Sequence, residues 1–413
     1  MQRRLDDILP RVTSMKIFFS VGEPSGDLHG ANLIRALAER RPDVECVGFG
    51  GPRMAAAGCE LHQDLTQLAI MWFGRVLLHL PKFFGYLRQA DEYFERERPD
   101  AVVLIDYPGF NWHVARKAHE RGIPVFYYGT PQLWGWAPWR IKKMRASVDH
   151  ALCKLPFEET WFRDRDVNAT YVGHPYFDEL RERKLDGEFV AAQQTSDRPL
   201  VAILPGSRTQ EVKSNLRDML KAARLVRQQV TEARFAIAAF KESQAEMARQ
   251  MVADCGLDAE VHVGRTPELI EAATATMAVS GSVSLELLYH TKPSVILYRI
   301  SRLAYAVQRR FRKVRYITLV NLLTTDDLFP ETPAVYDPES PEDAHVLMPE
   351  YLTCEDRTAD LAGHVVEWLT DDAKRASLES RMSDLRDRVA LGGASQRAAD
   401  YITAELSKQR RAA

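Results

Sequence analysis

Short apolar segments alternate along the chain with longer segments in which apolar residues recur at helical spacing. The apolar segments are typical of buried strands, and this alternation is typical of an α/β protein with parallel sheets. The strands predicted in the first half are 16–21, 45–49, 101–105, 125–128 and 151–154. A second series is predicted at 200–204, 234–239 and 276–279.

The segment between the two series, residues 181–199, is polar and charged and is interpreted as a linker. From about residue 356 the pattern is helical to the end. We therefore expect two Rossmann-like, doubly wound α/β domains that face a cleft, with a helical C-terminus. The predicted boundaries are an N-terminal extension at 1–14, a first domain at 15–185 and a second domain at 186–413.

Composition narrows the class of protein. Of the 413 residues, 46% are hydrophobic and 27% are charged, which is ordinary for a soluble globular protein. The formal net charge of −2 argues against a nucleic-acid partner, since such binders are usually basic. The five cysteines form no CxxC pair, which argues against a zinc site and a disulfide framework. With neither a signal-peptide core nor a window of ~20 apolar residues, a cytoplasmic protein is expected.

Two segments depart from the alternating pattern. Residues 68–87 are densely apolar and aromatic, and fit either a pair of core helices or an apolar surface that enters a membrane interface or holds acyl chains. Residues 292–315 carry eight Lys or Arg and no acid. They fit either a solvated helix face or a surface for anionic lipid headgroups.

The glycine loop after the first strand, GEPSGD, raises the question of a phosphate site. Its glycines do not have the GxGxxG spacing, and Glu23 and Asp27 would repel a phosphate at the helix start. Carboxylates beside a closely approachable backbone suit hydrogen bonds from sugar hydroxyls instead. The structural alternative is a helix N-cap at Ser25 or Asp27.

A better anion site follows the first strand of the second series. In PGSR, Gly206 lets the chain approach a ligand, Ser207 and the helix N-terminus offer donors, and Arg208 adds a fork-shaped cation.

A partner for that loop lies in SGSVSLE, at residues 280–286, which opens another helix with free backbone amides near Gly281 and Ser282. Glu286, one turn further, could accept from both hydroxyls of a ribose, although such a residue is often simply solvated. The two loops together predict a site for a nucleoside diphosphate.

The strand at 101–105 ends in a carboxylate, Asp106. Ligands in open α/β sheets bind beyond the carboxyl ends of strands, so Asp106 is expected at the ligand, where it could deprotonate an attacking hydroxyl. The alternative is a turn-forming Asp before Pro108. The DxD at 164–166 lies in a charged run and is interpreted as surface, not as a metal site.

These motifs resemble one family, the lipid-A-disaccharide synthases, which are inverting glycosyltransferases of the two-domain GT-B fold. The matching stretches run in order from about Met15 to Glu331. They are GEPSGDLHGANLIRAL, GGPRMAAAGCE, LPKFF, ERPDAVVLID with FN at 110–111, LWGW, RIKK, LPFEE, YVGHP, LPGSRTQEVK, SGSVSLE, KPSVILYR, and VNLL with PE at 330–331.

The resemblance implies a reaction that joins UDP-2,3-diacylglucosamine to 2,3-diacylglucosamine 1-phosphate, giving UDP and a β1→6 disaccharide. It implies no cofactor and no required metal. It also implies a peripheral enzyme on the cytoplasmic side of the inner membrane of outer-membrane bacteria. Whether the chain forms a homodimer stays open.

The resemblance further implies a role for each candidate residue. Asp106 would remove the proton of the acceptor 6-hydroxyl. The acceptor sugar would be held by Glu23, Ser25, Gly26 and Asp27. The UDP donor would be held by Gly206, Ser207, Arg208, Gly281, Ser282, Glu286 and Asn321, with Tyr298, Arg299 and the loop 264–267 as weaker candidates.

The sequence departs from the family at four places, which leaves the exact acceptor open. Ala137 replaces the arginine of WAWR, Gly109 replaces an acid, TTDDL at 324–328 replaces AGREL, and TPQ at 130–132 replaces SPS. Two other functions remain as alternatives. An epimerase acting on UDP-N-acetylglucosamine would not need the apolar segment 68–87, and a non-catalytic nucleotide-sugar or lipid-binding protein would not need Asp106.

Overall fold

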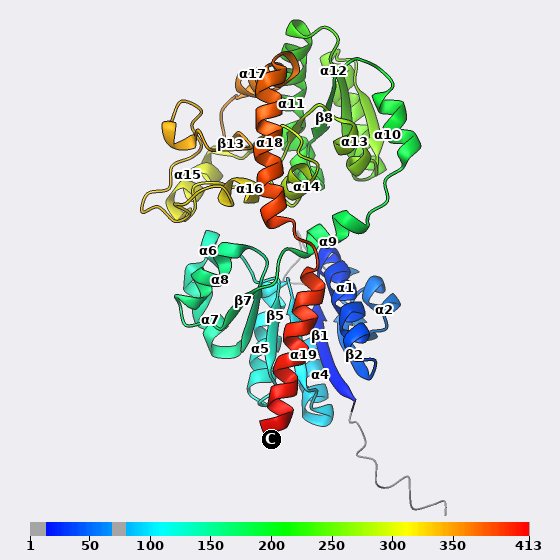
Figure 1. Cartoon of the computed structure of the whole chain (residues 1–413), viewed down its shortest axis with the longest axis vertical. Helices are drawn as coiled ribbons and strands as arrows, with labels where there is room; N and C mark the ends of the chain where they lie inside the picture. The colour runs from blue at the N-terminus through cyan, green and yellow to red at the C-terminus, as the bar shows by residue number, and fades with distance from the viewer. Residues whose placement is uncertain (1–13, 68–79, 413) are drawn as a thin grey trace, which may run out of the picture. The chain divides into compact units, whose positions relative to one another are not determined.

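A computed structural model describes residues 14–67 and 80–412. Most of the predicted extension (1–14) and most of the apolar segment 68–87 therefore lie outside the described residues. The described chain forms two compact units (Figure 1). One comprises the residues up to Asp178 and those from Gly392 onward, and the other is Glu179–Leu391.

The first unit is built on a parallel sheet, in which the described residues form seven strands in the order β3-β2-β1-β4-β5-β6-β7. The strands are β1 (Met15–Val21), β2 (Val44–Gly50), β3 (Glu60–Asp64), β4 (Ala101–Ile105), β5 (Val125–Tyr128), β6 (His150–Cys153) and β7 (Ala169–Tyr171). The helices are α1 (Pro24–Arg40), α2 (Pro52–Ala56), α4 (Leu80–Glu97), α5 (Pro108–His119), α6 (Leu133–Trp136), η2 (Pro138–Arg140), α7 (Ile141–Ser147), α8 (Pro156–Arg163), α9 (Pro175–Glu182), which crosses the unit boundary, and α19 (Ala394–Ala412).

The second unit repeats this architecture, and its described residues form six parallel strands in the order β10-β9-β8-β11-β12-β13. The strands are β8 (Leu200–Leu204), β9 (Arg234–Ala239), β10 (Glu260–Val263), β11 (Ala275–Ala278), β12 (Ser294–Arg299) and β13 (Glu350–Thr353). The helices are α10 (Gly187–Gln194), α11 (Thr209–Gln229), α12 (Glu242–Cys255), α13 (Thr266–Ala272), α14 (Val283–Tyr289), α15 (Arg302–Phe311), α16 (Leu319–Leu322), η3 (Pro341–Asp343), α17 (Thr358–Thr370) and α18 (Asp372–Val389).

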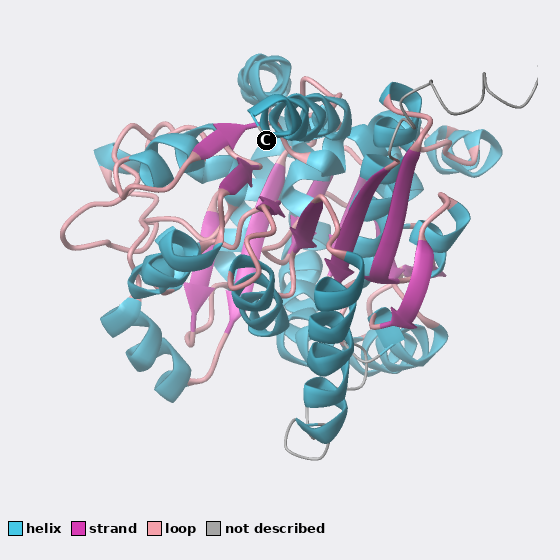
Figure 2. Cartoon of the chain, turned by 90° about the horizontal axis from the view of Figure 1, so that it is seen from below, coloured by secondary structure: helices cyan, strands magenta, loops and turns pink. Residues whose placement is uncertain are grey.

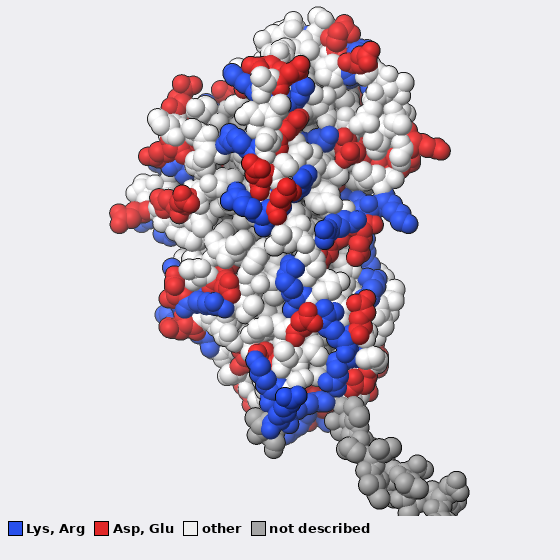
Figure 3. All heavy atoms as spheres, viewed as in Figure 1, with Lys and Arg blue, Asp and Glu red and all other residues white. Residues whose placement is uncertain are grey.

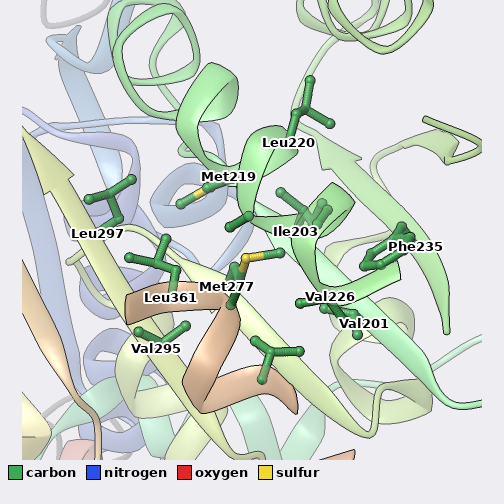
Figure 4. Packing of buried hydrophobic residues seen from close by; sticks show 14 of the residues in the cluster. Val201, Ile203, Met219, Leu220, Val226, Phe235, Met277, Val295, Leu297 and Leu361 are labelled. Atoms are coloured by element: carbon green, nitrogen blue, oxygen red, sulfur yellow. The ribbon is translucent and has the colours of Figure 1, made fainter. Parts of the chain in front are cut away.

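Helices lie on both sides of the strands (Figure 2), as a parallel sheet requires because both of its faces are apolar. In the second unit, the cluster in Figure 4 joins Ile203 of β8 and Met277 of β11 to Val226 of α11 and Leu361 of α17, all fully or almost fully buried. Burying a side chain of this size stabilises the fold by about 1.5–3 kcal/mol. The surface is of mixed charge, with acidic and basic side chains interspersed over the face in Figure 3.

The predicted fold class is confirmed, and the strand predictions are accurate where the strand is buried. The strands predicted at 101–105, 125–128, 200–204 and 234–239 coincide with β4, β5, β8 and β9, and the other four agree within one residue. Sequence analysis missed five strands: β3, β7, β10, β12 and β13. Two of these, β3 and β10, are partly exposed along their length and so lack a continuous apolar run.

The predicted linker at 181–199 is wrong in its middle, because α10 occupies Gly187–Gln194. The Asp186 side chain caps this helix by accepting a hydrogen bond from the Phe189 amide at 3.1 Å. The C-terminus is helical as predicted, with α17, α18 and α19. None of the helices within 14–67 and 80–412 is long and apolar enough to cross a membrane.

The last helix, α19, belongs to the first unit, whereas the predicted boundary of 186–413 placed it in the second domain. It packs against α1 in the first unit, where its buried face of Ala398, Ala399, Ile402 and Leu406 joins the core. Arg397 fixes its start by donating to the Val172 carbonyl at 2.8 Å. An apolar face of this kind is buried wherever a complementary surface exists, whatever its position in the sequence.

Candidate active site

The main candidate motifs lie at one place in each sheet. In both sheets the strand order reverses beside the first strand, between β1 and β4 and between β8 and β11. Ligands of doubly wound sheets bind beyond the carboxyl ends of the strands at this switch point. The loops after β1 and β4 carry GEPSGD and Asp106, and the loops after β8 and β11 carry PGSR and SGSVSLE.

Asp106 lies in a strained turn directly after β4. It and Tyr107 have φ values of 47° and 44°, in the left-handed region that non-glycine residues rarely adopt. Such conformations cost on the order of 1–3 kcal/mol each and need support from their surroundings. The Asp106 carbonyl accepts hydrogen bonds from Asn111 Nδ2 at 2.8 Å and from the Tyr127 hydroxyl at 2.7 Å. The turn is therefore held by groups on two neighbouring elements, and it redirects the chain at the point where the strand ends.

The Asp106 carboxylate is paired with Lys154, which follows β6. Lys154 Nζ donates to Asp106 Oδ1 at 3.3 Å, and the two side chains are only 16% and 22% exposed. Burial by itself lowers the pKa of Lys154, but the carboxylates of Asp106, Glu158 and Glu23 outweigh it, so the pKa is raised. Lys154 is therefore a cation at neutral pH.

Glu158 supports this lysine from α8. The Glu158 carboxylate is fully buried and accepts hydrogen bonds from the backbone amides of Lys154 (2.9 Å) and Leu155 (3.0 Å). It also accepts from Trp134 Nε1 at 3.0 Å and from the Thr130 hydroxyl at 3.3 Å. Burial raises the pKa of Glu158, and these donors oppose that rise. The Glu158 carboxylate thus connects, through hydrogen bonds, the end of the strand that carries Lys154 with the LWGW segment.

The start of α1 packs closely against this site. A Cβ at Gly22 would lie 2.3 Å from the Tyr107 ring, and one at Gly26 would lie 2.9 Å from Val21 Cγ1 and 3.6 Å from Asp106 Oδ2. Only glycine therefore fits at the two positions without a shift. Glu23, Pro24 and Ser25 are exposed at this end of the helix.

The Asp27 carboxylate is buried and is used within the protein. Its carboxylate is 3% exposed and accepts hydrogen bonds from the backbone amides of Gly51 (2.9 Å), Arg53 (3.0 Å) and Met54 (3.0 Å) at the start of α2. Asp27 thus caps α2, which gives it a structural role, and its contact with an acceptor stays a prediction. The alternative N-cap at Ser25 or Asp27 is wrong, since the N-cap of α1 is Glu23, whose side chain makes no capping hydrogen bond.

The PGSR loop of the second unit is held by contacts with Glu211 of α11 and Gln244 of α12. Gly206 has a φ of 118°, and a Cβ there would lie 2.5 Å from Glu211 Oε2. The same oxygen accepts from the Arg208 amide at 3.1 Å, while Glu211 Oε1 accepts from Arg208 Nη1 at 3.1 Å. The buried Gln244 donates to the Ser207 carbonyl at 2.9 Å. Because the Arg208 side chain is 67% exposed, its guanidinium is accessible to an anion.

The SGSVSLE loop is similarly fixed. Ser280 donates to the Ile317 carbonyl at 2.9 Å, and the Ser284 hydroxyl donates to the Gly281 carbonyl at 2.9 Å. Ser282 is the N-cap residue of α14 and makes no side-chain capping bond, so the first amides of that helix have no side-chain partner at the cap. These amides belong to the loop that follows β11, at the switch point.

Glu286 is not a solvated helix residue. It is 4% exposed and forms an ion pair with Arg183, which also pairs with Glu179 at 2.5 Å. Neither Arg183 nor Glu179 was a sequence candidate. A ribose at Glu286 would have to share the carboxylate with this arginine.

Asn321 is fully buried, and all of its amide groups are used within the protein. Its Nδ2 donates to the Met348 carbonyl at 2.7 Å and to Glu350 Oε2 at 2.9 Å, and its Oδ1 accepts from the Met348 amide at 3.1 Å. Glu350 also accepts from the Ile317 amide (2.6 Å) and the Thr318 amide (3.0 Å). Burial raises the pKa of Glu350 to about 7. Asn321 therefore organises the 317–321 loop and does not offer its amide to a ligand.

The weaker donor candidates are also engaged elsewhere. Arg299 pairs with Asp218 of α11, and its amide donates to Asn215 Oδ1 at 2.8 Å. Tyr298 packs against the core of the second unit. In the 264–267 loop, Arg265 pairs with Asp186 at 2.9 Å. All three residues are better explained by the fold than by a ligand.

The departures from the family pattern lie at distinct places. Ala137 is buried at the end of α6. Gly109 is exposed, and a Cβ added there would meet no atom within 4 Å, so a larger side chain would fit. Residues 324–326 of the third departure line a cavity of about 290 Å³. Its lining includes Thr324, Thr325, Asp326, His345, Arg381 and Arg388.

Besides Arg183 and Glu179, three residues around the site were missed from sequence: Lys154, Glu158 and Glu350. The first two had a usable signal, because KLPFE places a lysine at a strand end and a glutamate at the third helical position, where it caps the helix. Glu350 had none, since its partners are some thirty residues away in the chain. Among the described residues, no group of three or more His, Cys, Asp or Glu is placed to hold a metal ion.

Comparison with known proteins agrees with this architecture. Residues 17–350 match the family model described as lipid-A-disaccharide synthetase. The chain is 34% identical to the lipid-A-disaccharide synthase of Thiobacillus denitrificans, covering 94% of this chain and 99% of that protein. It is 32% identical to the synthase of Myxococcus xanthus, covering 94% and 96% of the two chains.

Solved structures show the same fold at low sequence identity. A putative UDP-N-acetylglucosamine 2-epimerase from Listeria monocytogenes is 11% identical with a TM-score of 0.62, and covers 96% of this chain and 97% of its own. The calicheamicin glycosyltransferase CalG4 is 14% identical with a TM-score of 0.56, and covers 96% and 99%. At this identity the likeness concerns the fold alone.

Proposed function

The chain belongs to the lipid-A-disaccharide synthase family, and from that membership we propose that it joins UDP-2,3-diacylglucosamine to 2,3-diacylglucosamine 1-phosphate. The products are UDP and the β1→6-linked disaccharide 1-phosphate. The enzyme is a hexosyltransferase of lipid A biosynthesis. The structural observation that best supports the reaction is the position of Asp106 at the switch point of the first sheet.

Asp106 is the proposed general base, and its two oxygens have different surroundings. Oδ1 accepts from Lys154, whereas Oδ2 lies toward Gly26 at the start of α1. We assign proton acceptance to Oδ2, with the acceptor sugar beside the exposed residues Glu23 and Ser25. A positioned base of this kind accelerates a reaction by about 10²–10⁴-fold.

In the proposed step the acceptor O6 attacks the anomeric carbon of the donor from the face opposite UDP. The new C1–O6 bond forms while the bond from C1 to the β-phosphate oxygen breaks, and its electron pair leaves with UDP. The proton of the 6-hydroxyl passes to Asp106. Attack from the opposite face inverts the configuration at the anomeric carbon.

The donor is assigned to the second unit. The pyrophosphate would be bound by the PGSR loop, the Arg208 guanidinium and the amides near Ser282, which together stabilise the charge that develops on the departing UDP. Glu286 would accept from the ribose hydroxyls while Arg183 holds its other side. Asn321 and Glu350 act as positioning residues that hold the nearby loop.

The substrates carry acyl chains, so we propose that the enzyme works as a peripheral protein at the cytoplasmic face of the inner membrane. The epimerase alternative draws support only from a fold shared at 11–12% identity, whereas the synthase family matches over residues 17–350. A non-catalytic role would not account for the supported Asp106 turn.

The test uses the purified protein in detergent micelles with both lipid substrates, and mass spectrometry to identify the products. Asp106→Asn is compared with Asp166→Asn, a matched control because Asp166 is an exposed aspartate of the same unit with a φ of 58°. The proposal predicts disaccharide and UDP from the parent protein, a loss of about 10²-fold or more in kcat for Asp106→Asn, and no change for the control. Absence of disaccharide from the parent protein would overturn the proposed reaction, and full activity of Asp106→Asn would overturn the base.

A further inference from the structure

Helix α15 presents its apolar side chains to solvent. Leu303, Val307 and Phe311 are 77%, 51% and 55% exposed, and no residue of the helix is buried. The more sheltered positions are Tyr305 and Gln308. A surface helix ordinarily turns its apolar stripe toward the core, so the orientation of α15 is reversed.

The three exposed residues form a continuous stripe, because residues four apart lie on the same face of a helix. Such a stripe costs free energy in water, and exposed apolar patches rimmed by polar groups mark interaction sites. No other element of the described chain combines three large apolar side chains at this spacing with exposures above one half.

The eight Lys and Arg residues between 292 and 315, which include those of α15, fall into two sets. Four of the eight cations are used within the unit: Lys292 on the Glu271 carbonyl, Arg299 on Asp218, Arg312 on the Pro333 carbonyl and Arg315 on Asp343. The other four are exposed: Arg302, Arg309, Arg310 and Lys313. None of these four forms an ion pair with any described residue of the chain.

Acidic residues are absent from this part of the sequence, which has no Asp or Glu from 287 to 325. The α15 surface, defined as Leu303, Val307 and Phe311 with the four exposed cations, therefore combines apolar side chains with cations, and its own stretch of sequence adds no carboxylate. The combination is what an interfacial helix needs, since the apolar face enters the headgroup boundary while the cations meet anionic lipids.

We propose that the α15 surface docks on an anionic phospholipid bilayer, with the helix axis in the plane of the interface. A second copy of the chain is the less suitable occupant, because a two-fold contact would bring the four cations of one copy against those of the other. Docking would hold the second unit at the membrane independently of substrate, so the inference does not depend on the proposed reaction.

The test is flotation of the full chain with vesicles of phosphatidylethanolamine and phosphatidylglycerol, compared with vesicles of phosphatidylcholine. The variant replaces the stripe (Leu303→Ser, Val307→Ser and Phe311→Ser), and the control is Leu391→Ser, an apolar residue of the same unit that is 57% exposed. We expect about a tenfold or greater loss of binding to the anionic vesicles for the variant, none for the control, and weaker binding at about 1 M salt. Unchanged turnover in detergent would show that the variant is folded.

A second measurement detects contact between α15 and the lipid directly. Phe311→Trp is mixed with vesicles that contain brominated phosphatidylglycerol, and its fluorescence quenching is compared with that of the parent protein. Additional quenching supports insertion at α15, and its absence overturns the proposal even if other segments bind the membrane. The proposal would also be overturned if the parent protein sedimented as a dimer and the triple serine variant as a monomer. That result would assign the α15 surface to contact with a second copy of the chain.

Discussion

Lys154 Nζ lies 3.3 Å from Asp106 Oδ1, in a pair that joins the ends of two strands separated in the sheet by β5. The ammonium occupies one carboxylate oxygen and leaves the other toward the start of α1. It also offsets part of the negative charge that the carboxylates of Asp106, Glu158 and Glu23 place around it.

We predict that Lys154→Met lowers kcat about 10-fold to 100-fold while KM for the UDP donor stays nearly constant, since a misplaced base mainly affects the chemical step. The readout is a steady-state assay of UDP release. Lys142→Met, at an exposed lysine of α7, is the control and should leave both constants unchanged. A variant that raised only the KM of the donor would contradict this role.

Replacement of Asp27 is predicted to act on stability. Asp27→Ala leaves three backbone amides at the start of α2 without their acceptor, which should lower the free energy of unfolding by about 1–3 kcal/mol in urea titrations. Glu23→Ala, at an exposed position of the same loop, should leave stability unchanged but weaken acceptor use. Equal stability of the two variants would show that the cap on α2 is unimportant.

Glu350 is predicted to make stability depend on pH. Its pKa rises from the usual 4.5 to about 7 in the folded protein, so between these values the folded state binds more protons than the unfolded state. Stability from this group is therefore present below about pH 4.5, falls as pH rises toward 7 and is constant above that. A shift of this size corresponds to about 3 kcal/mol.

The measurement compares the unfolding free energy of the parent protein and Glu350→Gln at several pH values. The difference isolates Glu350 from buried histidines such as His174, whose lowered pKa gives the opposite slope. We expect the deficit of the variant to shrink as pH rises from 5 to 7. A deficit independent of pH would mean that Glu350 is ionised throughout that range.

Substitution of two glycines is predicted to affect the proposed donor and acceptor sites differently. Gly206→Ala places a Cβ against Glu211 at a backbone φ of 118° and should weaken UDP binding by about tenfold or more in calorimetry. Gly26→Ala presses on Val21 beside Asp106 and should lower kcat with UDP affinity retained. Gly256→Ala has a φ of 65° but open space around its Cβ, so it should cost stability and leave UDP binding intact.

Much of the fold could be predicted from sequence because its central strands are continuous apolar runs. The strands β4 and β8 are buried at every position, and their bounds follow from that pattern alone. The candidate sites could be predicted for the same reason, since Asp106 and PGSR come directly after these strands. The short, partly exposed β3 and β10 lack the pattern and were missed.

Sequence alone therefore determined where the strands lie and which loops follow their carboxyl ends, because both depend on residues that are neighbours in the chain. Only the tertiary structure decided which side chains are available to a ligand. Asp27 meets the amides of α2, Asn321 meets Glu350, and α19 returns to the first unit. Each of these outcomes depends on a partner tens to hundreds of residues away, and a buried polar or apolar group takes the partner that folding brings to it.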